Sequence, residues 1–227
     1  MGVSIFVSVA CSNETINPGG QRVGFAHFPL EIGLFREYEV EDINLLFNGQ
    51  NDTSNFLLRE LIVDSVDNDD GTINYTLHQF SRQDTTQTWS LDSVWTTRRT
   101  AIQGIVVENN TPFVKLVFPV DENKTWDGNV LNTKEFDEYQ MVNVFREFVI
   151  DSLESISFGN TITVIQNDFR DNITMIDVRT EVYAENIGLV YKNIEILQFC
   201  ADPDCVGLEI VEVGRKLKQK IIDFGKE

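Results

Sequence analysis

Three cysteines are the side chains of this sequence best suited to covalent chemistry, and the first stands in a suggestive context. Cys11 follows a short apolar run that begins at Val3 and ends in the small residue Ala10. Such a run directly before a cysteine is typical of a bacterial lipoprotein signal, although no Lys or Arg precedes it and Ser8 stands where leucine is usual. We therefore expect Cys11 to be the lipidation site. A buried first strand with a free thiol is the alternative.

The other two cysteines, Cys200 and Cys205, flank the turn-forming sequence Asp202-Pro203-Asp204. Four residues across a tight turn bring two Cα atoms into bridging range, whereas zinc sites use closer pairs and need further ligands. We predict a disulfide that closes a hairpin over residues 198–206 and stabilises the fold by roughly 2 kcal/mol. A pair of reduced thiols is the alternative. A disulfide would place the protein in an oxidising compartment.

The remaining residue types do not form a catalytic or metal-binding pattern. His27 and His78 are the only histidines, and neither has the spacing of a metal motif or a catalytic triad, so we expect both at the surface or at a strand edge. The acidic run 67–71 departs from the EF-hand pattern and predicts a hairpin turn. We predict no catalytic residue, no metal site and no cofactor. With 36 Asp and Glu, an acidic-pair hydrolase of the glycosidase kind stays as the alternative.

The elements that must carry these residues are strands, because apolar and polar residues alternate with period two through most of the chain. Only residues 133–143 allow a turn or two of helix. The predicted strands cover residues 38–47, 58–66, 72–80, 87–98, 105–118 with a turn at 108–111, 139–150, 161–167, 178–184 and 189–199 with a turn at 186–188 between them, 208–213 and 217–224.

This pattern predicts an all-β, mainly antiparallel fold: a strongly curved sheet or open barrel, lipocalin-like or lipoprotein-carrier-like, with little helix. Residues 1–11 would be the remnant of the lipoprotein signal, residues 12–26 a flexible tether and residues 27–227 one β domain. In such a sheet, the 16 Phe, five Tyr and three Trp fill the core and can also line an apolar pocket.

The net charge of the chain limits the partners that it can bind. The formal net charge of −18 and the pI near 4.4 repel phosphate backbones, so we expect no nucleic-acid partner. An anionic bilayer would not attract this chain either, and contact with a membrane would depend on the lipid anchor at Cys11.

Three segments of the chain carry a resemblance to known proteins. They are Phe28-Pro-Leu-Glu-Ile-Gly33 with Tyr38, Lys115-Leu-Val-Phe-Pro-Val120 with Lys124-Thr-Trp-Asp-Gly128, and Glu181 to Lys192. Together these segments resemble a family of uncharacterised Bacteroidetes lipoproteins. The chain departs from that group at Arg36, where Trp is usual, and at Asn186-Ile187, where Gly-Val is usual. The resemblance covers most of the chain from His27 on, and it implies a β-rich envelope protein without an established activity.

Together these observations predict a non-catalytic lipoprotein of the cell envelope, held to the outer membrane on its periplasmic or outer face. Its expected partners are the membrane, through the lipid anchor, and either an apolar small molecule or an envelope protein.

Overall fold

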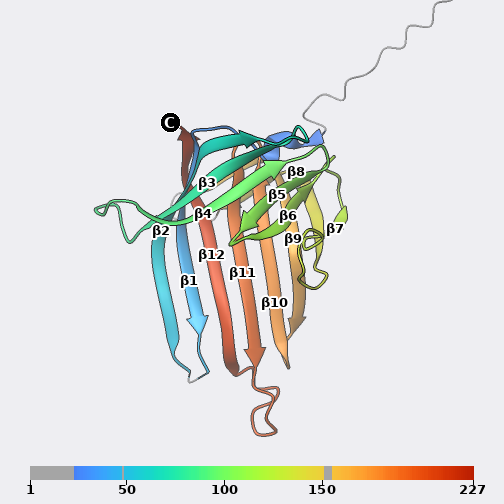
Figure 1. Cartoon of the computed structure of the whole chain (residues 1–227). Coiled ribbons are helices and arrows are strands. Elements are labelled where there is room, and N and C mark those ends of the chain that lie inside the picture. The colour runs from blue at the N-terminus through green and yellow to red at the C-terminus, as the bar shows by residue number, and fades with distance from the viewer. Residues whose placement is uncertain (1–22, 48, 151–154) are drawn as a thin grey trace, which may run out of the picture.

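The computed structural model of the chain describes residues 23–47, 49–150 and 155–227, which form one antiparallel sheet of twelve strands (Figure 1). The predicted fold class is confirmed: the sheet is strongly curved and nearly closes on itself. The one helical element that lies wholly within these ranges is a short 3-10 turn, η1 (Phe25–His27). Within the same ranges, no helix is both long and apolar enough to cross a membrane.

The strands follow the period-two segments closely. Their bounds are β1 (Leu34–Leu45), β2 (Asn51–Asp67), β3 (Ile73–Arg82), β4 (Ser90–Arg99), β5 (Gln103–Glu108), β6 (Thr111–Val117), β7 (Thr125–Asp127), β8 (Glu138–Ile150), β9 (Ile156–Asp171), β10 (Met175–Ala184), β11 (Gly188–Phe199) and β12 (Val211–Lys226).

Strands that are neighbours in the sequence are neighbours in the sheet, with the single exception of β6 and β7. The order is β6-β5-β4-β3-β2-β1-β12-β11-β10-β9-β8-β7, so the first and last strands pair, with Val40 opposite Gln219. The two edge strands, β6 and β7, are consecutive in the chain. The sheet is therefore an up-and-down meander whose opening lies between β6 and β7.

A few hydrogen bonds close this opening in place of a strand ladder. The backbone N–H of Val114 donates to the carbonyl of Gly128 at 3.0 Å, and Trp126 Nε1 donates to the carbonyl of Val114 at 2.8 Å. A Cβ atom on Gly128 would lie 2.4 Å from the ring of Tyr139. Glycine is therefore what lets the end of β7 approach β8 this closely.

Two apolar clusters form the core. The first joins β5 and β6 to β8, β9 and β10 and includes Ile105, Leu116, Met141, Ile162 and Val164. Val23 and Phe25, within the expected tether, pack against this cluster. The remainder of that segment, residues 12–22, lies outside the described residues, as do residues 1–11. The second cluster includes Tyr38, Val40, Phe158, Val182 and Ile221.

Two local predictions were wrong. Residues 133–143 contain no helical turn: residues 133–137 form a loop, and β8 begins at Glu138. The predicted strands 208–213 and 217–224 are one strand, β12, which begins at Val211. The basic residues 215–220 lie on β12 between β1 and β11, where Lys216 pairs with Glu195 at 2.8 Å and Lys218 stands opposite Glu41.

The turns at 108–111 and 186–188 were predicted correctly. Asn109 and Asn110 have φ of 48° and 63° in the β5–β6 turn, and Asn186 and Gly188 have φ of 63° and 91° in the β10–β11 turn. Asn and Gly are the residues that tolerate this left-handed backbone. A Cβ atom on Gly188 would lie 2.4 Å from Arg36 Nη1, so this glycine also leaves room for an arginine on β1.

Candidate binding cavity

The concave side of the sheet encloses a cavity of about 430 Å³, within the range of small-molecule sites in proteins. Its wall is made by β1 to β6, by β10 to β12, and by Phe28 and Pro29, which follow η1. The apolar lining consists of Phe28, Val40, Phe56, Leu58, Leu77, Trp95, Val106, Leu189, Ile194 and Leu217. Inward aromatic residues do line a pocket in this curved sheet, as expected, but they share it with charged residues.

Eight charged residues complete the wall, four of each sign. The cations are Arg36, Lys115, Lys192 and Arg215, and the anions are Glu60, Asp92, Glu108 and Glu181. The lining is thus electrically balanced, although the chain as a whole carries a formal net charge of −18. Two networks hold most of these charges.

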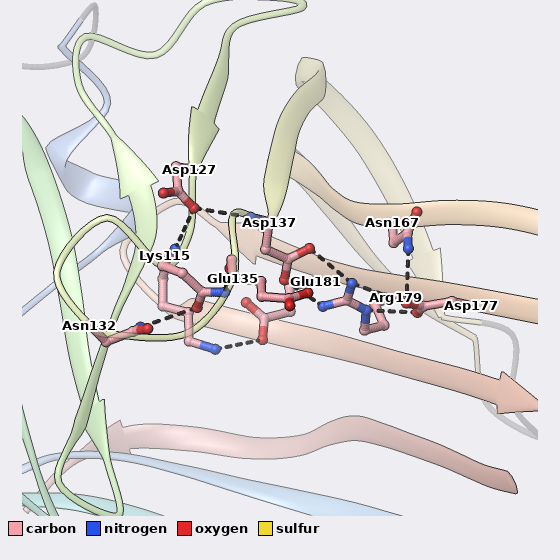
Figure 2. A network of polar contacts seen from close by, with 10 residues as sticks. Lys115, Asp127, Asn132, Glu135, Asp137, Asn167, Asp177, Arg179 and Glu181 are labelled. Atoms are coloured by element: carbon pink, nitrogen blue, oxygen red, sulfur yellow. Dashed lines mark hydrogen bonds and ion pairs between the residues drawn. The ribbon is translucent and has the colours of Figure 1, made fainter.

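The first, the Lys115 network, connects β5, β6, β10 and β11. Lys115 Nζ lies 2.7 Å from a carboxylate oxygen of Glu108. Figure 2 shows its second contact, at 3.2 Å, with a carboxylate oxygen of Glu181. Lys192 Nζ approaches the same oxygen of Glu181 at 3.4 Å, and Tyr183 donates its hydroxyl proton to the other oxygen at 2.6 Å. Lys115 and Glu181 are 66 residues apart in the sequence, so the pair links the β6 edge to β10.

These contacts keep the network ionised. Burial alone would raise the pKa of Glu181, but the charges of Lys115 and Lys192 and the hydrogen bond from Tyr183 outweigh it and lower that pKa to about 2. Burial would likewise raise the pKa of Glu108, and the same two lysines lower it. For Lys115, the two carboxylates overcome burial and raise its pKa.

The second, the Glu60 network, forms a row across β1 to β4. Arg36 contacts Glu60 through Nε at 3.1 Å and Nη2 at 3.0 Å, and Gln79 donates to the other carboxylate oxygen at 3.1 Å. Ser93 donates to the amide oxygen of Gln79 at 2.9 Å. The Tyr38 hydroxyl lies within hydrogen-bond distance of two acceptors, Glu60 at 3.3 Å and the carbonyl of Leu189 at 3.0 Å. Glu60 is therefore held by donors from two strands, β1 and β3.

A third set of ion pairs, the Arg179 network, supports the wall from beyond the cavity (Figure 2). Arg179 on β10 binds both carboxylate oxygens of Asp137, at 2.7 Å and 3.0 Å, and contacts Asp177 on its own strand at 2.7 Å. Asp137 lies in the loop between β7 and β8, and its backbone N–H donates to Asp127 at 3.1 Å. Arg179 thus anchors the loop that closes the sheet opening.

Strand alternation explains why these side chains meet. Residues two apart on a strand share a face, so Arg179 and Glu181 on β10 lie on one side, as do Arg36 and Tyr38 on β1. The three segments that carry the lipoprotein resemblance all reach this cavity: Phe28 and Arg36 come from the first, Lys115 from the second, and Glu181 to Lys192 from the third.

The predicted disulfide partners are at bridging distance. Their Cα atoms are 5.8 Å apart, and Cys200 and Cys205 are bonded to each other. The predicted tight hairpin with both cysteines on paired strands is wrong. Both lie in the longer β11–β12 connection, where the backbone N–H groups of Cys205 and Val206 donate to the carbonyl of Asp202. Cys11, the predicted lipidation site, lies outside the described residues.

The two histidines lie in different environments. The expectation that His27 lies at the surface or at a strand edge was wrong. His27 has 1% exposure and lies beside the ring of Phe145, with centroids 5.8 Å apart. Its burial lowers its pKa. His78 is half-buried on β3 beside Phe80. The predicted turn after Asp67 is confirmed, with Gly71 donating to the carbonyl of Asn68.

The charged residues of the wall were not selected from the sequence. Lys115 on β6 and Glu181 on β10 stand at inward positions among mainly apolar residues of their own strands. This placement was the one signal in the sequence that these charges are buried. It does not reveal a partner 66 residues away. The pairing follows only from the strand order.

No protein-family model and no curated protein sequence matches this chain. Two solved structures are similar to it. One is described as a "putative exported protein with YmcC-like fold" from Bacteroides fragilis, with 10% identity and a TM-score of 0.44. The other is a "putative lipoprotein" from Parabacteroides distasonis, with 10% identity and a TM-score of 0.42. Each alignment covers 88% of this chain and 98% of the other, and a likeness at this level carries no argument about function.

Proposed function

We propose that the chain is a non-catalytic lipoprotein of the cell envelope that holds an apolar or amphiphilic small molecule inside its curved sheet. The observation that carries this proposal is the cavity of about 430 Å³ with ten apolar lining residues. Burial of an apolar chain against such a wall contributes roughly 25 cal/mol per Å² of surface removed from water. Protein interiors are otherwise close-packed, so a cavity of this size does not contribute to the stability of the fold.

The geometry of the acidic residues supports a binding role over the hydrolase alternative. Glu108 and Glu181 are brought within about 6 Å of each other by the shared Lys115, a separation comparable to that of a glycosidase pair. In such an enzyme, however, one carboxyl must stay protonated at neutral pH to act as the general acid. Here the pKa of each carboxyl is lowered, so both are ionised.

Attachment to the outer membrane is the part of the proposal that depends on Cys11. The oxidising compartment expected from the Cys200–Cys205 pair agrees with export. Replacing Cys11 by Ala in the native host should move the protein from the outer-membrane fraction to the soluble fraction. Unchanged membrane retention of this variant would exclude the lipid anchor.

Cavity binding is tested with a neutral apolar fluorophore such as N-phenyl-1-naphthylamine and the purified protein. Leu217 lines the cavity, whereas Ile222 on the same strand is 46% exposed and outside the lining. We expect Leu217→Trp to weaken probe binding about tenfold by filling the cavity, and Ile222→Trp to leave it unchanged. Equal binding by both variants and the wild type would place the probe elsewhere and refute the proposal.

A further inference from the structure

The charges on the cavity wall are neutralised by one another. Lys115 and Lys192 share Glu181, Lys115 also contacts Glu108, and Arg36 is bound to Glu60. Arg215 meets Asp42 through two contacts of 2.9 Å. The remaining wall acid, Asp92, is exposed to solvent, where water screens its charge.

This pairing disfavours a charged ligand of either sign. An anionic head group could reach Lys115 or Lys192 only by competing with a carboxylate that is already 2.7–3.4 Å away, and it would also enter a chain of net charge −18. A cationic head group would meet the same obstacle, because Glu60 and Glu181 are each already contacted by three donor side chains. Displacing a partner leaves an uncompensated buried charge, which is costly.

Among the described residues, two polar side chains of the wall are left for an uncharged partner. Trp95 on β4 has a buried indole N–H without a hydrogen-bond partner. Gln219 on β12 lines the cavity with 7% exposure, and its amide has no hydrogen-bond partner among the described residues. It stands between Val40 on β1 and Lys192 on β11 in the strand register. A primary amide offers both donors and an acceptor, so it can bond a hydroxyl or an amide group. Buried amides are otherwise almost always hydrogen-bonded.

We infer that the cavity selects an uncharged amphiphile, whose hydroxyl or amide functions hydrogen-bond Gln219, over an anionic or a cationic amphiphile with the same apolar chain. The apolar chain lies against Phe56, Leu58 and Leu217. This inference rests on the proposed binding function and names its ligand class.

The test compares three ligands with one twelve-carbon chain and different head groups: monolauroylglycerol, laurate and dodecyltrimethylammonium. Binding to the purified full chain is measured by calorimetry below the concentrations at which the ligands aggregate. We expect monolauroylglycerol to bind at least about tenfold more tightly than either charged ligand. Binding of all three with equal affinity would refute the selectivity and leave the binding function standing. Binding of none would refute both.

Two variants locate the selectivity in the wall. Gln219→Leu should weaken monolauroylglycerol binding about fivefold, the effect of one hydrogen bond, whereas Gln198→Leu, at an exposed position on β11, should have no effect. Glu181→Gln should strengthen laurate binding at least about fivefold, because Lys115 and Lys192 lose a shared countercharge. If Gln219→Leu behaves as the control, or Glu181→Gln leaves laurate unchanged, the assignment is wrong.

Discussion

Replacing Glu181 by Gln tests whether the buried ion network of the cavity wall is ionised in the folded protein. Gln keeps the size of the side chain and can still accept the hydrogen bond from Tyr183, but it removes the charge that faces Lys115 and Lys192. The pKa of Glu181 falls from an ordinary value of 4.5 to about 2 on folding. Since each tenfold change in proton affinity corresponds to about 1.4 kcal/mol, the ionised form stabilises the fold by about 3 kcal/mol at pH 7.

The sign of the pH dependence follows from the direction of that change. Because the folded pKa of Glu181 is depressed, its contribution is complete above the unfolded pKa near 4.5 and is lost as the pH falls towards 2. The Glu181→Gln variant should therefore be less stable than wild type by about 3 kcal/mol at pH 7, and by only about 1.5 kcal/mol at pH 3.

The assay is denaturant unfolding of both proteins at pH 7, 5, 4 and 3. Glu195→Gln is the matched control, because Glu195 pairs with Lys216 on the exposed side of the sheet at 2.8 Å, and such surface pairs contribute at most about 1 kcal/mol. A stability difference for Glu181→Gln that stays constant from pH 7 to pH 3 would refute the reasoning, as would a variant as stable as wild type at pH 7.

Three further outcomes follow from the contacts. Gly128→Ala should cost about 1–3 kcal/mol of unfolding free energy, because the added methyl group overlaps a tyrosine ring; an unchanged melting temperature would contradict this. Replacing Cys200 and Cys205 together by Ser should cost about 2 kcal/mol and leave the circular dichroism spectrum intact, and loss of the fold would show that the bridge does more than close its loop. Arg179→Gln should cost about 2 kcal/mol and speed hydrogen exchange in the loop between β7 and β8, so unchanged exchange there would exclude the anchoring role of this arginine.

Period-two alternation was sufficient to find most strands, because it is a local property of a half-buried sheet. It located the strand from Tyr139 and the turn at Asn186 to Gly188 without knowledge of their neighbours. It failed where backbone geometry departs from a regular strand. In β8, Asn143 and Phe145 have φ of 52° and 57°, and the backbone N–H of Asn143 is held by Glu122. Nothing in the sequence signals this irregularity.

The cavity could not be predicted for a different reason. Its wall depends on the pairing of β1 with β12, and thus on residues such as Val40 and Gln219 that are 179 positions apart in the chain. A local pattern places Lys115, Glu60 and Glu181 on inward faces, but it carries no information on which strands meet. The sequence therefore predicts an inner face with charges on it, and the partner of each charge depends on the strand order.

The fold itself does not require these charges. Replacing a buried ion network by apolar residues of similar volume is often neutral or stabilising, whereas removal of one partner is costly. Glu181, with 1% exposure, and Lys115, with 7% exposure, therefore stabilise the sheet no better than a matched apolar pair would. An apolar pair would, however, turn the wall into a general apolar surface that accepts a chain with any head group. In the proposed binding role, a wall in which each buried charge is neutralised by its neighbour, beside a buried amide without a partner, would discriminate between head groups by their charge. The ligand class that we propose would therefore account for ion networks that the stability of the sheet does not require.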